Sequence, residues 1–230
     1  MNVKQNLEQI NDHITKSLEK ANRTARPNVI AVTKYVTIER AKEAYDAGIR
    51  HFGENRLEGF QEKHEALPDD AVMHFIGTLQ SRKVKEVIDD IDYLHALDRK
   101  SLAKEINKRA SHVVKCFVQV NVSEEESKHG LALEEVDAFI ELLEQYENIK
   151  VVGLMTMAPY TDDESEIRDI FEKLRNKRDE IKAKNLDYAP CTELSMGMSN
   201  DYEIAAEEGA TFVRIGTKLV GKEELSLIHI

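Results

Sequence analysis

Short apolar runs alternate with longer amphipathic segments along almost the whole chain. The runs are rich in Val, Ile and aromatic residues and are bounded by Gly, Pro or polar residues, which is typical of buried strands. This pattern predicts a series of strands, the longest at 113–122. In chain order they are expected at residues 29–32, 51–55, 73–77, 93–96, 113–122, 151–155, 193–195 and 212–215.

The segments between these runs show the spacing of amphipathic helices. Residues 3–21 place apolar side chains on one face at helical intervals, ahead of the first strand. Thr37 is a predicted N-cap and Gly48 a predicted C-terminal stop for the next helix, and Asp98 is a predicted N-cap further along. Helices are expected at about 3–21, 37–48, 56–67, 80–88, 98–110, 134–146, 164–184 and 200–208, of which 164–184 is the longest.

Strands that alternate with helices imply parallel strands joined by right-handed crossovers. Eight strand–helix units behind one additional N-terminal helix favour an α/β fold of the closed (β/α)8 TIM-barrel type. An open doubly wound sheet is disfavoured, since no GxGxxG follows the first strand. We expect one domain over residues 1–224. The apolar tail at 225–230 is either a packed terminal strand or a remnant of the expression vector.

The composition narrows the class of protein. A chain of 230 residues with 41% hydrophobic residues can bury a sizeable core. Its net charge of −11 argues against general nucleic-acid binding and against binding to an anionic membrane surface. Because the N-terminus is polar and no apolar run is long enough to span a membrane, we expect a cytoplasmic protein. Cys116 and Cys191 lack CxxC spacing and are expected to be reduced.

The histidines are scattered through the chain without an HExxH or HxH motif, so no metal site is predicted. His51 and Glu54 lie three residues apart on a predicted strand and should therefore face opposite sides of it. His74 is expected to be a core histidine with its hydrogen bonds satisfied, rather than a catalytic group.

The C-terminal stretch at 193–221 predicts an anion site. Its two strands each end in a cluster of Ser, Gly and Thr, and a helix is expected to begin near Asn200. Small residues let backbone N–H groups approach a phosphate, and a helix N-terminus adds the positive end of its dipole. In a (β/α)8 barrel the loops after strands 7 and 8 commonly hold a phosphate.

Strand alternation selects further candidate residues at the predicted barrel mouth. Lys34 follows the inward face of the first strand, and a partly desolvated amine there is a nucleophile for a carbonyl; the alternative is a surface lysine. Arg214 should also point inward, toward either an anionic or acceptor ligand or an ion pair with Glu54 or Glu193. Asn55 is either a ligand contact or a helix N-cap.

Six motifs occur in the order that is found in one known family. They are Val-Thr-Lys at 32–34, His-Phe-Gly-Glu-Asn at 51–55, His-Phe-Ile-Gly-Thr-Leu-Gln at 74–80, Gly-Leu-Met-Thr-Met at 153–157, Leu-Ser-Met-Gly-Met-Ser at 194–199 and Val-Arg-Ile-Gly-Thr at 213–217. On these motifs the chain resembles the YggS/PROSC family of pyridoxal phosphate homeostasis proteins over residues 3–221. Thr78 and Ser81-Arg82 depart from the residues frequent in that family, beside the expected mouth.

The resemblance implies a barrel like the alanine racemase N-terminal domain that binds pyridoxal 5′-phosphate (PLP) as a Schiff base. By the same resemblance Lys34 is the Schiff-base lysine, and Arg214 is the partner of the pyridine nitrogen. Asn55 would orient the ring or its phenolic oxygen. Ser199, Gly216 and Thr217 look like phosphate contacts, and Ser195 is expected to line the same pocket.

Three functions remain open at this point. The first is a carrier and regulator of PLP supply without robust catalysis, which would pass PLP to apo-enzymes and is expected to be a monomer. The second is a PLP-dependent amino-acid racemase, which needs an acid–base group on each face of the substrate. The chain lacks the second domain that supplies one such group in alanine racemase, and Tyr35 is expected to project away from Lys34. The third is a Schiff-base aldolase that uses Lys34 without a cofactor.

Overall fold

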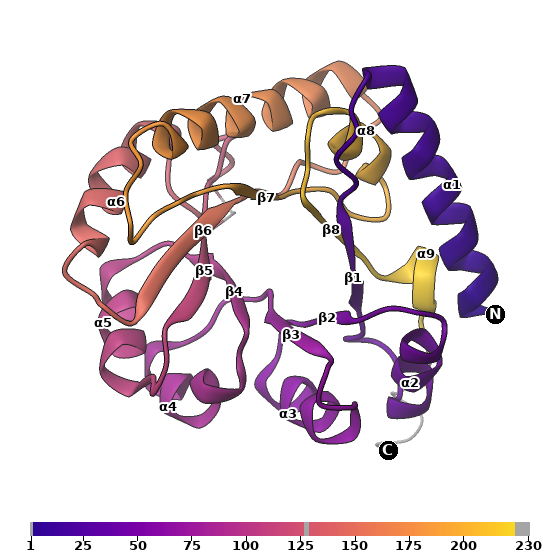
Figure 1. The fold of residues 1–230 in the computed structure, drawn as a ribbon, viewed down its shortest axis with the longest axis horizontal. Coiled ribbons are helices and arrows are strands. Elements are labelled where there is room, and N and C mark those ends of the chain that lie inside the picture. The colour runs from indigo at the N-terminus through magenta and orange to yellow at the C-terminus, as the bar shows by residue number, and fades with distance from the viewer. Residues whose placement is uncertain (1, 127–128, 224–230) are drawn as a thin grey trace.

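A computed structural model describes residues 2–126 and 129–223 of the chain. Its strands are all parallel and close into a barrel in chain order, because β8 pairs with β1 (Figure 1). The (β/α)8 fold that the sequence predicts is therefore confirmed. The strands are β1 (Asn28–Val32), β2 (His51–Glu54), β3 (Val72–Phe75), β4 (Tyr93–Leu97), β5 (Val114–Gln119), β6 (Ile149–Met155), β7 (Glu193–Ser195) and β8 (Phe212–Ile215).

Helices surround the barrel, and an additional helix precedes the first strand (Figure 1). The predicted caps of the second helix are confirmed: the side chain of Thr37 accepts a hydrogen bond from the N–H of Arg40, and Gly48 follows the helix with φ of +112°. The helices are α1 (Val3–Ala21), α2 (Ile38–Asp46), α3 (Leu57–Ala66), α4 (Val84–Val87), α5 (Lys100–Arg109), α6 (Val136–Leu143), α7 (Glu164–Lys182), α8 (Tyr202–Glu207) and α9 (Thr217–Val220).

Several boundaries differ from the sequence prediction. The strand expected at 113–122 ends at Gln119, since the N–H of Asn121 bonds to the carbonyl of Leu131 and draws the chain away from the sheet. At seven residues, β6 is longer than β5. The predicted N-cap Asp98 is also wrong, because its carboxylate accepts a hydrogen bond from the N–H of Gly130 and the N-cap of α5 is Arg99.

Other helices are shorter than expected or were missed. The segment predicted as a helix at 80–88 is one turn of α4 between two 3-10 turns, and α8 begins at Tyr202 rather than near Asn200. The sequence pattern gave no sign of α9. The predicted domain 1–224 and tail 225–230 extend outside the described residues.

The apolar residues form two separate clusters. The larger cluster fills the layer between the barrel and its helices, and includes the buried faces of α1, α5 and α7. The smaller one contains Ile30, Phe117, Met155 and Phe212, which are contributed by four different strands. A barrel interior this small is filled by side chains. Its polar residues must therefore find partners inside the barrel or at its mouth.

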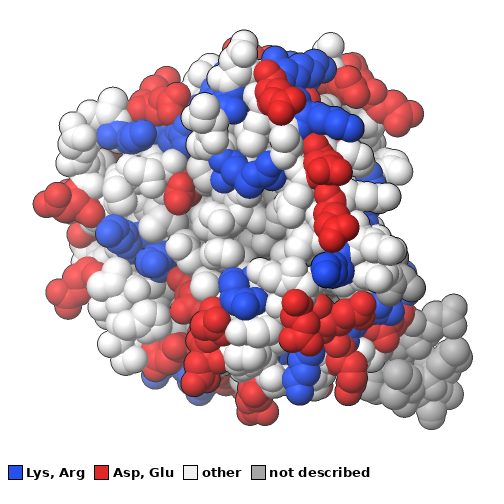
Figure 2. Space-filling view, turned by 45° about the vertical axis from the view of Figure 1, so that its right-hand side comes forward, with Lys and Arg blue, Asp and Glu red and all other residues white. Residues whose placement is uncertain are grey.

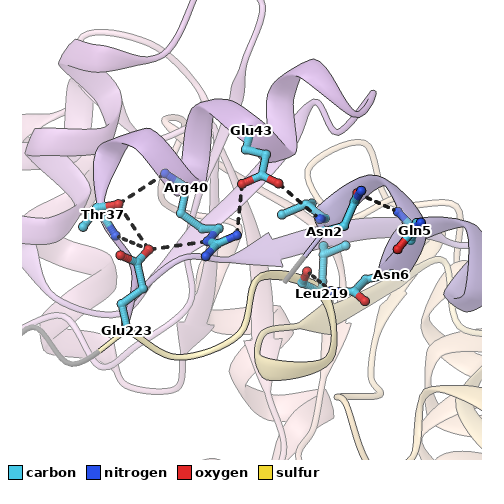
Figure 3. A network of polar contacts seen from close by, with 9 residues as sticks. Asn2, Gln5, Asn6, Thr37, Arg40, Glu43, Leu219 and Glu223 are labelled. Carbon is cyan, nitrogen blue, oxygen red and sulfur yellow. Dashed lines mark hydrogen bonds and ion pairs between the residues drawn. The ribbon is translucent and has the colours of Figure 1, made fainter.

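The additional helix α1 lies outside α8 and α9, next to the seam between β8 and β1 (Figure 1). Its buried residues include Ile10, Ile14 and Leu18, as the helical spacing predicts. A polar network continues from its N-terminus across α2 and α9 (Figure 3). In it the carboxylate of Glu43 accepts from the N–H of Val3, and the side chain of Asn6 donates to the carbonyl of Leu219 at 3.0 Å.

The same network anchors the segment that follows α9. The carboxylate of Glu223 accepts hydrogen bonds from both the N–H and the hydroxyl of Thr37, and lies 3.5 Å from the guanidinium of Arg40 (Figure 3). The chain beyond β8 is thereby attached to the start of α2, beside the turn that carries Lys34.

Basic and acidic side chains are interspersed over the face shown in Figure 2, without an extended basic patch. This distribution agrees with the acidic net charge of the whole chain. Among the described residues, no helix combines the length and the apolar character required to cross a membrane.

Replacing Ile14 with Ala should lower the free energy of unfolding by about 2–5 kcal/mol, because the side chain is fully buried between α1 and the rest of the barrel. Urea unfolding followed by circular dichroism would measure the loss. The matched control is Lys16→Ala on the exposed face of the same helix, which should stay within about 0.5 kcal/mol of the wild type. Similar losses in both variants would contradict the packing role assigned to α1.

Candidate functional site

A cavity of about 660 Å³ opens at the carboxyl ends of the barrel strands. Six of the seven residues predicted for the site line this one cavity, although they belong to or follow four different strands. They are Lys34, Asn55, Ser199, Arg214, Gly216 and Thr217. The carboxyl-terminal mouth is where barrel enzymes and cofactor-binding barrels carry their functional groups.

Lys34 lies in the turn that follows β1 and is half-buried. As strand alternation predicts, Ile30 belongs to the interior cluster, and both Val32 and Lys34 line the cavity. The expectation that Tyr35 projects away is wrong, because the Lys34 Nζ lies 4.8 Å from the centroid of the Tyr35 ring. The ring of Tyr35 lines the cavity as well.

A buried ion pair supports the backbone immediately before Lys34. The Nζ of Lys63 donates to the carboxylate of Glu54 at 2.8 Å and to the main-chain carbonyl of Thr33 at 3.2 Å. The hydroxyl of Thr33 also donates to Glu54. Burial raises the pKa of the Glu54 carboxyl, and the charge of Lys63 opposes that rise. Glu54 faces the helix layer while His51 faces the interior, as predicted from their spacing.

Arg214 is a buried cation beneath the cavity. It pairs in register with Ile30 and points inward, where its Nη2 donates to the carbonyl of Thr156 at 3.0 Å and its Nη1 donates to the hydroxyl of Ser195. Burial lowers the pKa of Arg214 to about 10, so the guanidinium stays protonated at neutral pH.

The ion pair considered for Arg214 does not form in the described part of the chain. Glu54 is paired with Lys63 instead, and no carboxylate among the described residues forms a salt bridge with the Arg214 guanidinium. A buried cation that is bonded to neutral acceptors and forms no direct ion pair retains a strong capacity to donate a hydrogen bond to a ligand acceptor. The ligand alternative for Arg214 is thus favoured by its surroundings.

Asn55 follows β2 and faces the cavity. The helix-cap alternative is excluded, because the N-cap of α3 is Arg56. The Oδ1 atom of Asn55 is buried and has no hydrogen-bond partner within the described residues. Buried polar atoms are seldom left unpaired in native proteins. This atom is therefore available to a ligand in the cavity.

The loops after β7 and β8 form the wall where the sequence predicts a phosphate. Ser199 lies in the loop between β7 and α8, while Gly216 and Thr217 mark the start of α9. The first N–H groups of a helix have no intrahelical partners and can donate to an anion. At Gly216 an added Cβ would come no closer than 3.6 Å to Val32, so the absence of a side chain mainly leaves space toward the cavity.

Ser195 is the predicted site residue that does not line the cavity. It is fully buried behind Arg214, and its hydroxyl also lies 2.8 Å from Nδ1 of His95. The chain of contacts continues through His74 to His51. Sequence reasoning missed His95 and the connection between these residues. The available signal was that three successive strands each carry a histidine at an inward position.

Other expectations concern residues outside this cluster. Cys116 and Cys191 are free and buried, and burial raises the pKa of both thiols, that of Cys191 to about 12. No group of three or more His, Cys, Asp or Glu residues in the described ranges is placed to hold a metal ion. His129, from the loop after β5, is a further lining residue; sequence reasoning left that loop open between a ligand-contacting mouth loop and an ordinary solvated turn.

Comparisons with known proteins agree with this geometry. The family model for the alanine racemase N-terminal domain matches residues 4–224. A pyridoxal phosphate homeostasis protein of Aquifex aeolicus is 42% identical, over 97% of this chain and 100% of that protein. Among solved structures, an unknown protein from Bifidobacterium adolescentis has a TM-score of 0.90 at 33% identity, covering 95% of this chain and 94% of that one. PipY of Synechococcus elongatus with PLP bound has a TM-score of 0.82 at 31% identity, covering 95% and 100%.

The buried histidines predict a dependence of stability on pH. Burial lowers the pKa of His74 and of His95 well below 6.5, so the unfolded chain takes up protons that the folded chain does not. Their contribution is fully present above about pH 6.5. As the pH falls below that value, each residue should lower the free energy of unfolding by about 1.4 kcal/mol per pH unit, until its folded-state pKa is reached.

Urea unfolding at about pH 7.5 and about pH 5.5 would measure this loss. The difference between the two pH values should become smaller by about 1 kcal/mol in His95→Asn, since one titrating group is removed. His112→Asn, at an exposed position, serves as the control and should change the difference less than His95→Asn does. An unaltered pH difference in His95→Asn would contradict the buried neutral state of His95.

Proposed function

The chain belongs to the alanine racemase N-terminal domain family and, within it, to the pyridoxal phosphate homeostasis proteins, and from this premise we propose that it binds PLP as a carrier and regulator of its supply. The observation that carries the proposal is the convergence of a lysine, a buried arginine bonded only to neutral acceptors, and the two loops that carry Ser199 and Thr217 on one cavity. The PLP bound to PipY, a full-length relative, supports the same cofactor here.

The residues present fit each chemical part of PLP. The amine of Lys34 would hold the aldehyde carbon as a Schiff base, with loss of water. The unpaired Oδ1 of Asn55 and the buried guanidinium of Arg214 are suited to polar groups of the ring, Arg214 to the pyridine nitrogen. Ser199 and the start of α9 at Gly216 and Thr217 would contact the phosphate. Bound PLP supplies an electrophilic aldehyde and an electron-withdrawing ring.

Arg214 favours a carrier over a racemase. With a pKa of about 10, its guanidinium keeps its protons and donates a hydrogen bond, so the pyridine nitrogen would stay unprotonated. An unprotonated ring withdraws electrons weakly and gives little stabilisation to a carbanion on a bound amino acid. Binding without rapid turnover is the behaviour that this arrangement supports.

A PLP-dependent amino-acid racemase is the second candidate, and one observation favours it. Tyr35 lines the cavity beside Lys34, so its phenol lies near the Lys34 amine. In a racemase the amine would serve one face of the substrate and the phenol would serve the opposite face. Racemisation still requires a stabilised carbanion, which the contact with Arg214 opposes. The carrier is therefore the better supported function.

The setting in which the carrier acts is also part of the proposal. We infer a cytoplasmic monomer that delivers PLP to apo-enzymes. The acidic net charge and the interspersed surface charges argue against nucleic acid as a partner (Figure 2).

Wild-type protein that is mixed with PLP and then freed of unbound PLP should keep a visible Schiff-base absorption band, and Lys34→Ala should lose it, because the covalent link to the amine forms the Schiff base and retains the cofactor. Absorption spectra of the purified proteins measure the effect. The matched control is Lys222→Ala, whose amine also lies over the Tyr35 ring, at 5.0 Å, without lining the cavity. A colourless wild type that still cleaves a sugar phosphate would favour the aldolase instead.

The carrier should hand its PLP to an apo-enzyme and show no racemisation of alanine or serine at a useful rate. Activity regained by an added PLP-dependent apo-enzyme measures the transfer, and chiral chromatography of the amino acids measures racemisation. Sustained turnover in the wild type that disappears in Tyr35→Phe would overturn the carrier in favour of the racemase.

A further inference from the structure

Three histidine rings form a continuous hydrogen-bonded chain inside the barrel. Nδ1 of His51 lies 2.9 Å from Nε2 of His74, and Nδ1 of His74 lies 2.8 Å from Nε2 of His95. Nδ1 of His95 then lies 2.8 Å from the hydroxyl of Ser195, which accepts a hydrogen bond from Arg214. The chain thus runs from the half-buried His51 to the guanidinium beneath the cavity.

The strand register produces this arrangement. On β2, the residue that pairs with His74 is Gly53, which lies two residues beyond His51. On β4, the residue that pairs with His74 is Tyr93, and His95 lies two residues beyond it. An offset of two residues keeps the side chains on the same face of the sheet. Each histidine therefore points inward and lies one step closer to the carboxyl ends than the histidine before it.

Aromatic neighbours hold the ring planes in place. The ring of Tyr93 stacks on His74 with centroids 4.6 Å apart, and the ring of Phe117 stacks on His95 with centroids 4.4 Å apart. His74 and His95 are completely buried. Because these rings are enclosed, each nitrogen has to be satisfied by the next member of the chain.

Counting protons along the chain fixes its direction. Arg214 can only donate, so the Ser195 oxygen accepts from it. If His95 also donated to that oxygen, the Ser195 hydroxyl proton would need another acceptor, and no other contact of this hydroxyl exists among the described residues. If Ser195 instead donates to Nδ1 of His95, every hydrogen bond in the chain contains one proton. His95 and His74 then each carry their proton on Nε2.

We propose that His95, supported by His74, is a positioning residue that holds the Ser195 hydroxyl so that its oxygen faces Arg214 and fixes the guanidinium beneath the cofactor ring. The inference rests on the proposed binding of PLP, since the guanidinium is then aimed at the pyridine nitrogen. A serine hydroxyl rotates freely when it has no fixed acceptor. The acceptor nitrogen of His95 removes that freedom, and Arg214 gains a preorganised partner before the ligand arrives.

The direction of the chain can be tested in the wild-type protein without PLP. Nitrogen-15 NMR of the histidine side chains at neutral pH should show His95 and His74 as neutral rings protonated on Nε2. Neutral rings protonated on Nδ1, or a doubly protonated ring at either position, would overturn the proposal. This outcome does not depend on whether the protein binds PLP.

Two substitutions separate the contacts of His95. In His95→Asn, the amide oxygen takes the place of Nδ1 and can still accept from Ser195. In His95→Gln, the longer side chain places its amide near the position of Nε2, toward His74, and Ser195 loses its acceptor. The dissociation constant for PLP should rise about tenfold in His95→Gln and change less than about twofold in His95→Asn.

The NMR signals of the Arg214 guanidinium provide a second readout in the absence of PLP. Its protons should exchange with water faster in His95→Gln than in His95→Asn. Equal PLP affinities and equal exchange rates in the two variants would show a merely structural role and overturn the proposal. If the wild type has the expected tautomers and exchange rates but binds no PLP, the proposed function fails while the positioning of Arg214 stands.

Discussion

Closure of the parallel sheet by the pairing of β8 with β1 decides where every functional side chain of this protein lies. In a closed parallel barrel all carboxyl ends meet at one mouth, whatever their separation in the sequence. Lys34 and Arg214 are far apart along the chain, yet they follow or belong to adjacent strands and line one cavity. Helix α1 and the network around Glu223 cover that same seam from outside (Figure 3).

The same closure creates a demand for hydrogen bonds inside the barrel. The outer layer between sheet and helices is largely apolar, whereas the interior contains polar side chains that water cannot reach. A buried guanidinium without a carboxylate partner needs neutral acceptors, and Arg214 finds them in Ser195 and Thr156. Neutral acceptors leave the guanidinium free to interact strongly with a ligand, which a salt bridge would have prevented.

The polar features of the mouth have different physical roles. The ion pair of Glu54 and Lys63 supports the backbone before Lys34 from the helix side of β1. The histidine chain supports Arg214 from the interior side. Two supports on opposite faces of the sheet hold a lysine and an arginine at fixed positions, which is the preorganisation that the proposed binding of PLP requires.

The sequence by itself determined the alternation of strands and helices, the closed barrel, and the convergence of Lys34 and Arg214, because strand periodicity and element order are local properties. It did not determine which strand was longest, the absence of a cap at Asp98, or the existence of α9, since hydrogen bonds between distant segments set these. It also could not place Ser195 behind Arg214 or join His95 to His74. Those contacts depend on strand register and on the packing of rings inside the closed barrel, which only the tertiary structure fixes.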